Sequence, residues 1–71
     1  MDNLADRVKR LRGDAGITQT ELAILASISR RTVARIEAGW TGANRSTIRL
    51  LAQALGVTPE ELLDDNGEEA A

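Results

Sequence analysis

Residues Thr18 to Glu37 read TQTELAILASISRRTVARIE and contain two short amphipathic segments with a tight turn between them. Glu21 follows Thr18 by three residues, which is the spacing of a capping box at the start of a helix. Ser29 is a second helix-starting residue and comes directly after the first segment. The stretch therefore predicts one helix that begins after Thr18 and ends before Ser29, and a second helix over residues 30–38.

Apolar residues recur at helical spacing in both segments and predict the faces that turn toward a core. Two helices joined by so short a turn bring their backbones close together, and a small residue such as Ala23 suits that approach. The predicted inward-facing residues are Leu22, Ala23, either Leu25 or Ala26, Val33, Ile36 and, as a further candidate, Ala34.

A further helix is predicted before this pair, over about residues 4–15, with Gly16 as its stop. Its cap is Asn3 or Asp2, both of which have a side-chain oxygen that can accept from a free N–H group of the first turn. Gly13 inside the helix costs about 1 kcal/mol relative to Ala. We therefore expect this helix to fray after Arg12.

Two more helices are predicted after the pair. Asn44 caps one over about residues 45–55, and Thr58 begins a short last helix. Five short helices with connections of a few residues predict one compact all-α domain over residues 1–63. Residues 64–71, DDNGEEAA, have nothing to bury and are expected to form a flexible acidic tail.

The residue types present argue against several classes of function. The chain of 71 residues has no Cys and no His, which removes disulfides, zinc sites of the usual ligand types, thiol nucleophiles and imidazole bases. We therefore expect no enzyme activity, no metal, no cofactor and no small-molecule ligand. The sequence has no signal-peptide pattern and no run near the roughly 20 apolar residues that span a bilayer, so we expect a cytoplasmic protein with no membrane partner.

Charge is distributed unevenly along the chain. The net charge is -2, yet residues 1–55 have all 9 Lys and Arg against 5 acids, a net of +4. Residues 56–71 have 6 acids and no base, a net of -6. The net charge of the whole chain is therefore negative although residues 1–55 are basic. A basic surface is the electrostatic feature expected of a nucleic-acid-binding protein.

The pattern LADRVKRLRGDAGITQTELAILASISRRTVARIEAG, followed by NRSTIRLLAQALGVTPEELL, resembles the lambda-repressor and Cro-like helix-turn-helix family, often called the XRE family. The resemblance covers about residues 4–63 without an evident insertion or deletion. It implies a five-helix DNA-binding domain whose second and third helices form the helix-turn-helix. It also implies a sequence-specific transcriptional regulator of double-stranded DNA, a repressor, which acts as a homodimer on a near-palindromic operator.

The resemblance also implies which residues read the bases. In this family the second helix of the motif lies in the major groove with its first turns against base edges. Arginine there can donate two parallel hydrogen bonds to guanine, so we expect guanines in each operator half-site. The alternative is that these arginines form an ordinary solvated face. The expected base-reading residues are Ser29, Arg30, Arg31, Thr32 and Arg35.

Other positions are candidates for contacts to DNA phosphates, which set register and much of the affinity. Gln19 matches a family position that often contacts a phosphate, although it can also be simply a polar helix end. Thr41, Asn44 and Arg45 are candidates on the other side of the motif, with capping and solvation as the alternative for the last two. Trp40, the only aromatic residue, is a plug of the core, a dimer contact or a contact to the DNA backbone.

Two further expectations concern the frame of the motif. Arg12 and Glu37 match family positions that form an ion pair between the first helix and the end of the recognition helix. Ser27 replaces the glycine that the family usually has in the turn, where the backbone is often left-handed, so we expect some strain there.

A protein-interaction module of the same fold is the alternative function, either an antitoxin or a regulatory partner that binds a protein. Such a module should have an apolar patch where this chain has its arginines. The candidates for a dimer interface are Leu62, Leu63 and Trp40.

Overall fold

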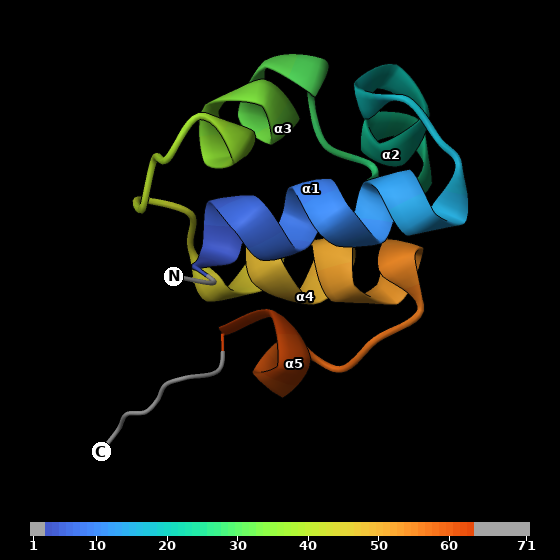
Figure 1. The fold of residues 1–71 in the computed structure, drawn as a ribbon. Coiled ribbons are helices and arrows are strands. Elements are labelled where there is room, and N and C mark those ends of the chain that lie inside the picture. Colours follow the sequence, from blue (N-terminus) through green and yellow to red (C-terminus); the bar gives the residue numbers. More distant parts are fainter. Residues whose placement is uncertain (1–2, 64–71) are drawn as a thin grey trace.

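The computed structural model describes residues 3–63, which fold into five α-helices and no strand (Figure 1). The helices are α1 Leu4–Ala15, α2 Gln19–Ala26, α3 Arg30–Glu37, α4 Arg45–Leu55 and α5 Pro59–Leu63. In Figure 1, α1 and α4 lie across the middle of the domain, with α2 and α3 on one side and α5 on the other. The predicted all-α, five-helix organisation is confirmed. The expected tail, residues 64–71, lies outside the described residues.

Side-chain caps begin the helices where the sequence predicts them. At α2, Thr18 Oγ1 accepts from the N–H of Glu21 at 3.0 Å, and Glu21 Oε1 accepts from the N–H of Thr18 at 2.8 Å, so both halves of the capping box are present. At α1 the cap is Asn3, and the alternative, Asp2, lies outside the described residues. The side-chain oxygens of Asn3, Ser29, Asn44 and Thr58 each accept the N–H three residues further on, at 2.9 to 3.2 Å.

Helix α1 does not fray after Arg12 as the sequence led us to expect, and continues to Ala15. Gly16 adopts the left-handed conformation with φ 72°, and its N–H donates to the carbonyl groups of Arg12 and Gly13. These two bonds close the last turn of α1, because they give partners to carbonyl groups that a helix end would otherwise leave without one. Gly16 is the glycine predicted to end this helix, and closure of the last turn there outweighs the local cost of Gly13.

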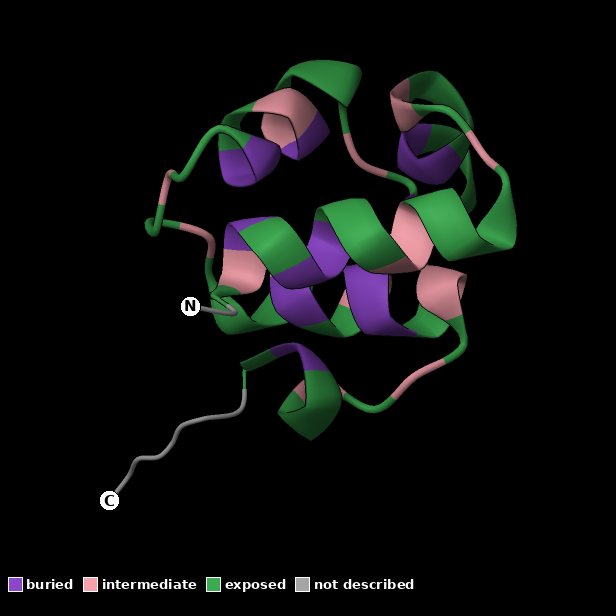
Figure 2. Ribbon diagram, in the orientation of Figure 1, coloured by how far each residue is buried: buried purple, intermediate pink, exposed green. Residues whose placement is uncertain are grey.

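Every helix contributes between one and three buried side chains to the core, and buried positions occur along all five helices in Figure 2. Helix α2 settles the choice between Leu25 and Ala26: Ala26 is buried, while 60% of Leu25 is exposed. Ala23 is 3% exposed on the same face of α2, as its small size led us to expect. The fully buried large side chains are Val8, Leu22, Val33, Ile36, Leu51 and Leu62.

The short helix α5 is attached to the core by Leu62, which has no exposed surface. Burial of a leucine side chain is worth about 1.5 to 3 kcal/mol, a large contribution for a helix of this length. Leu62 is therefore unavailable for the dimer contact suggested from the sequence, because its side chain is already used within the domain. Its neighbour Leu63 is 54% exposed. No helix among residues 3–63 has the length and apolar character needed to cross a membrane.

Candidate nucleic-acid interface

The turn between α2 and α3 is made by Ser27, which has φ 59° and ψ 39°. It is the only residue other than glycine with a positive φ among the described residues. The left-handed conformation costs a residue with a Cβ roughly 1 to 2 kcal/mol. The turn is closed by the N–H of Ile28, which donates to the carbonyl of Ala23 at 3.0 Å. The strained, left-handed backbone expected at this position is thus present. This conformation allows α3 to begin within a few residues of the end of α2.

Two of the expected base readers also cap the start of α3. Ser29 Oγ accepts from the N–H of Thr32 at 3.1 Å, and the two hydroxyl groups share a hydrogen bond of 2.8 Å. Ser29 is exposed and Thr32 is half-buried. Since a hydroxyl is both a donor and an acceptor with two lone pairs, the capping bonds leave each group further hydrogen-bonding capacity.

The arginines of α3 face away from the core. Arg31 and Arg35 are exposed and stand four residues apart, so they share one face of the helix. Val33 and Ile36 occupy the opposite side and are fully buried. Arg30 is also exposed, at the first position of the helix. Positive charge at a helix start opposes the macrodipole by about 0.3 to 1 kcal/mol, so this arrangement does not favour folding.

Trp40 lies just beyond α3 and packs back against it. Its side chain is half-buried against the core, and its backbone N–H donates to the carbonyl of Arg35 at 2.9 Å. The guanidinium carbon of Arg35 lies over the indole ring, 4.2 Å from the ring centroid. Of the alternatives raised by the sequence, the structure contains the packing role. Nothing in the sequence pattern predicted the contact with Arg35.

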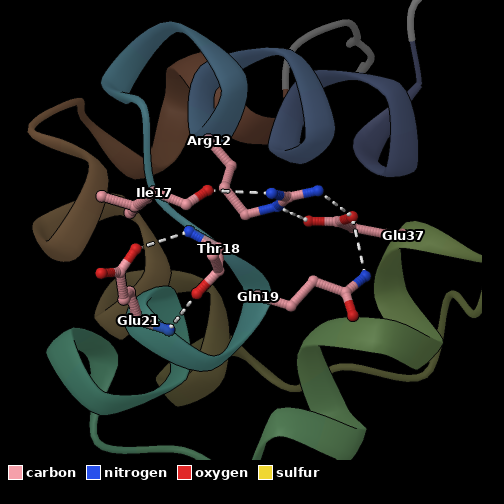
Figure 3. Close-up of polar contacts among 6 residues, drawn as sticks. All are labelled: Arg12, Ile17, Thr18, Gln19, Glu21 and Glu37. Atoms are coloured by element: carbon pink, nitrogen blue, oxygen red, sulfur yellow. Dashed lines mark hydrogen bonds and ion pairs between the residues drawn. The ribbon is translucent and has the colours of Figure 1, made fainter.

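A cluster of polar side chains joins α1, α2 and α3 (Figure 3). Arg12 Nε and Nη2 donate to the two carboxylate oxygens of Glu37 at 2.7 and 3.1 Å, so the expected ion pair is present and bidentate. Arg12 Nη1 also donates to the carbonyl of Ile17 at 2.9 Å. The amide of Gln19 donates to Glu37 Oε1 at 3.0 Å. The end of α3 is therefore tied to both helices beside it.

The cluster keeps Glu37 ionised although this residue is only 7% exposed. Burial raises the pKa of the Glu37 carboxyl, but the hydrogen bonds from Arg12 and Gln19 and the positive charge of Arg12 lower it by more. The net pKa lies below the ordinary value. The hydrogen bond to Glu37 likewise raises the pKa of Arg12 above its usual range.

Known proteins share this arrangement of helices. The family described as a helix-turn-helix domain matches residues 3–64 of the chain. The chain belongs to the helix-turn-helix domain family. Its resemblance to the lambda-repressor-like, XRE members is thereby confirmed. Among curated proteins, no match was found.

Solved structures share the fold of this helix-turn-helix domain. The restriction-modification controller protein C.AhdI from Aeromonas hydrophila is 33% identical with a TM-score of 0.80, and the match covers 84% of this chain and 91% of that protein. A chain of the SinR protein/SinI protein complex is 25% identical with a TM-score of 0.83; the match covers 87% of this chain but only 61% of that one. The P22 c2 repressor in complex with synthetic operator 9T is 23% identical, has a TM-score of 0.84, and shows likeness of fold over 93% of this chain and 100% of that one.

Three phosphate candidates lie at two helix starts, and Thr41 lies in the loop between α3 and α4. Gln19 is the first residue of α2, and one of its two amide N–H groups is used by Glu37, a bond that the sequence pattern did not predict. Asn44 uses its side-chain oxygen as the α4 cap, which leaves its amide N–H groups to donate. Arg45 and Thr41 are exposed. Their contacts to phosphate stay predictions.

Proposed function

We propose that this helix-turn-helix protein is a transcriptional repressor that binds double-stranded DNA and reads the major groove with α3. The observation that carries the proposal is the pair Arg31 and Arg35, exposed together on the face of α3 opposite the core. Each can donate two parallel hydrogen bonds to the O6 and N7 atoms of guanine. Arg30, Ser29 and Thr32 complete the proposed reading surface at the start of the helix.

Phosphate contacts on both sides of α3 would fix its register in the groove. The starts of α2 and α4 suit this role, because the first N–H groups of a helix and its dipole favour an anion. Gln19 and Asn44 each retain an amide N–H donor at these starts, and Arg45 adds a positive charge. Thr41 and the indole N–H of Trp40 are further donors in the loop between α3 and α4.

The proposal includes a homodimer on a near-palindromic operator, with half-sites about one helical turn apart. A single recognition helix contacts few base pairs, and a second copy doubles the number read. Leu63 supports this arrangement, since its side chain is 54% exposed at the end of α5.

A second candidate function is the binding of another protein. Two adjacent apolar side chains of α2, Ile24 and Leu25, are 71% and 60% exposed. One of the similar structures is the SinR protein/SinI protein complex, so a domain of this fold occurs in an assembly with a protein. Protein binding through Ile24 and Leu25 and DNA binding through the arginines of α3 would use different helices of the domain.

The test is selection of bound sequences from a pool of random double-stranded DNA at two salt concentrations. We expect one guanine-containing motif to be enriched and the affinity to fall with salt as phosphate counterions are released. Arg31→Ala and Arg35→Ala should each lower specific affinity by about 1 to 3 kcal/mol and relax the motif at one position. Absence of enrichment and of binding at low salt would overturn the proposal.

Arg49→Ala is the matched control for lost charge. Arg49 is an exposed arginine of α4, so its removal changes the net charge by the same amount without altering α3. We expect the control to weaken binding to all sequences about equally and to leave the motif unchanged. A motif that relaxes equally in the control and in the α3 variants would contradict base reading by α3.

A further inference from the structure

Arg35 is the one proposed base reader whose side chain is held by a ring. Its guanidinium carbon is 4.2 Å from the centroid of the Trp40 ring, well inside the roughly 6 Å over which a cation is attracted to an aromatic face. Trp40 is the only aromatic residue of the chain, so Arg31, on the same face of α3, has no equivalent partner. The two arginines thus differ in how far their side chains are fixed before DNA binds.

The Trp40 ring is itself restrained by its surroundings. Its backbone N–H is bonded to the carbonyl of Arg35, and its side chain packs on the core. Gly42 also lies against the ring, since an added Cβ there would come within 2.6 Å of Nε1 and 2.7 Å of Cε2 and Cζ2. Gly42 has no positive φ, so glycine is required here by the closeness of the ring and not by the backbone conformation.

Holding the guanidinium in advance has a consequence for recognition. An arginine side chain loses much rotamer freedom when a base fixes it, and a side chain ordered beforehand loses less on binding. The guanidinium has five N–H donors, so contact with the ring leaves donors for two parallel bonds to guanine. The ring therefore restrains Arg35 without consuming its capacity to read a base.

We propose that Trp40 is a positioning residue for Arg35, whose guanidinium it holds over a ring that lies against Gly42, and that it thereby sets the base preference at the position Arg35 reads. The inference rests on the proposed function, because it assigns Arg35 to a base. It also differs from a phosphate contact by Trp40, which would strengthen binding to every sequence alike.

The experiment compares base preference in four variants, each selected on the same random DNA pool. Trp40→Leu keeps an apolar side chain and removes the ring face, Trp40→Phe keeps a smaller ring face, and Gly42→Ala leaves Trp40 intact but displaces its ring. Arg35→Ala identifies the position that Arg35 reads. We expect Trp40→Leu and Gly42→Ala to reduce preference at that position about threefold to fivefold, Trp40→Phe to restore most of it, and the position read by Arg31 to stay unchanged.

Two further measurements separate positioning from a structural role. In an Arg35→Ala background, Trp40→Leu should have no additional effect on base preference. In the free wild-type protein, the δ protons of Arg35 should show an upfield ring-current shift by proton NMR, which Trp40→Leu and Gly42→Ala abolish. A loss of preference spread over all positions, an effect that persists without Arg35, or a free protein lacking the shift would overturn the inference.

The two levels of failure are distinguishable. If the wild-type protein enriches no DNA sequence, the proposed function fails and the assignment of Arg35 to a base fails with it. If the wild-type protein enriches a motif and the Trp40 and Gly42 variants leave the Arg35 position unchanged, only the positioning role is wrong.

Discussion

At the scale of single residues, Ser27 is where the chain departs from the most favourable choice for the fold. Its left-handed backbone, φ 59°, costs a residue with a Cβ roughly 1 to 2 kcal/mol. Glycine removes that cost but adds about 0.4 to 1 kcal/mol of chain entropy to the unfolded state. We therefore expect Ser27→Gly to raise the free energy of unfolding by about 0.5 to 1 kcal/mol, net of these two effects. Urea unfolding at neutral pH measures it.

Ser27→Ala is the matched control, because alanine retains the Cβ and with it the strain. It should leave stability unchanged or slightly lower it. Equal stabilisation by alanine and glycine would show that the serine hydroxyl, and not the left-handed backbone, is responsible for the cost.

The residue scale also shows where prediction from the sequence stops. The caps at Thr18 and Ser29 follow from local rules, since each depends on residues no more than three or four positions away, whereas the left-handed position of Ser27 was expected from the glycine that the family usually has there. The stacking of Arg35 on Trp40 depends on the path of a loop and on two rotamers, which periodicity does not specify. The need for a glycine at position 42 becomes evident only in the structure, where the Trp40 ring lies beside it.

At the scale of helices, the pattern fixes where each helix begins more firmly than which side chain turns inward. Leu25 and Ala26 are neighbours about 100° apart on α2, so apolar periodicity left both possible, and only packing against the other helices buries Ala26. The ion pair of Arg12 with Glu37 was expected from the family. The additional bond from Gln19 was not, because it requires α2 and α3 to be in their final positions.

Because this ion pair links α1 to α3, we expect the free energy of unfolding to depend strongly on both of its partners. Arg12→Met would leave the Glu37 carboxylate, 5% exposed as a side chain, with Gln19 as its remaining described donor. Because an uncompensated buried charge is costly, we expect a loss of about 2 to 3 kcal/mol, below the value for a fully buried pair since Arg12 is 22% exposed. Urea unfolding measures the free energy.

The double variant Arg12→Met with Glu37→Met tests the reason for that loss. Two apolar residues leave no charge to compensate, so it should be more stable than Arg12→Met alone. A double variant that is less stable by the sum of the two single losses would show that the partners act independently.

The lowered pKa of Glu37 makes the same link sensitive to acid. A carboxyl whose pKa is lower in the folded than in the unfolded protein adds stability above the unfolded value, near 4.5, and loses it as the pH falls through the folded value. We expect the free energy of unfolding to decrease on acidification below about that value, and Glu37→Gln to decrease less steeply over the same range. Parallel curves for the two proteins would contradict the assignment to Glu37.

At the scale of the whole molecule, the five-helix domain was predictable because its signals repeat. Five caps with the same three-residue spacing and two glycine stops divide the chain into helices whose apolar faces can meet only in one core. The interface of the proposed dimer was less accessible to prediction. Leu62 looked available in the sequence, yet α5 needs it for attachment to the core, and Leu63 is the residue left exposed.

The separation of charge along the chain gives a prediction for the molecule as a whole. Residues 64–71 contain four acids, Asp64, Asp65, Glu68 and Glu69, on a chain whose first 55 residues have a net charge of +4. The negative charges of these acids repel the DNA phosphates. Converting the four acids to Asn and Gln should therefore tighten binding to random-sequence DNA at low salt. The effect should fade toward 1 M salt, where screening acts within about 3 Å. Fluorescence anisotropy over a salt series measures both.

A shuffled version of residues 64–71 is the control for that experiment, because it preserves the charge and changes the order of residues. It should bind random-sequence DNA as the wild-type chain does. Thermal unfolding of all three proteins should be followed in parallel, so that a change in stability is not mistaken for a change in binding. If the neutral variant binds no more tightly at low salt, or the shuffled variant binds differently from the wild type, repulsion by charge is not what these residues contribute.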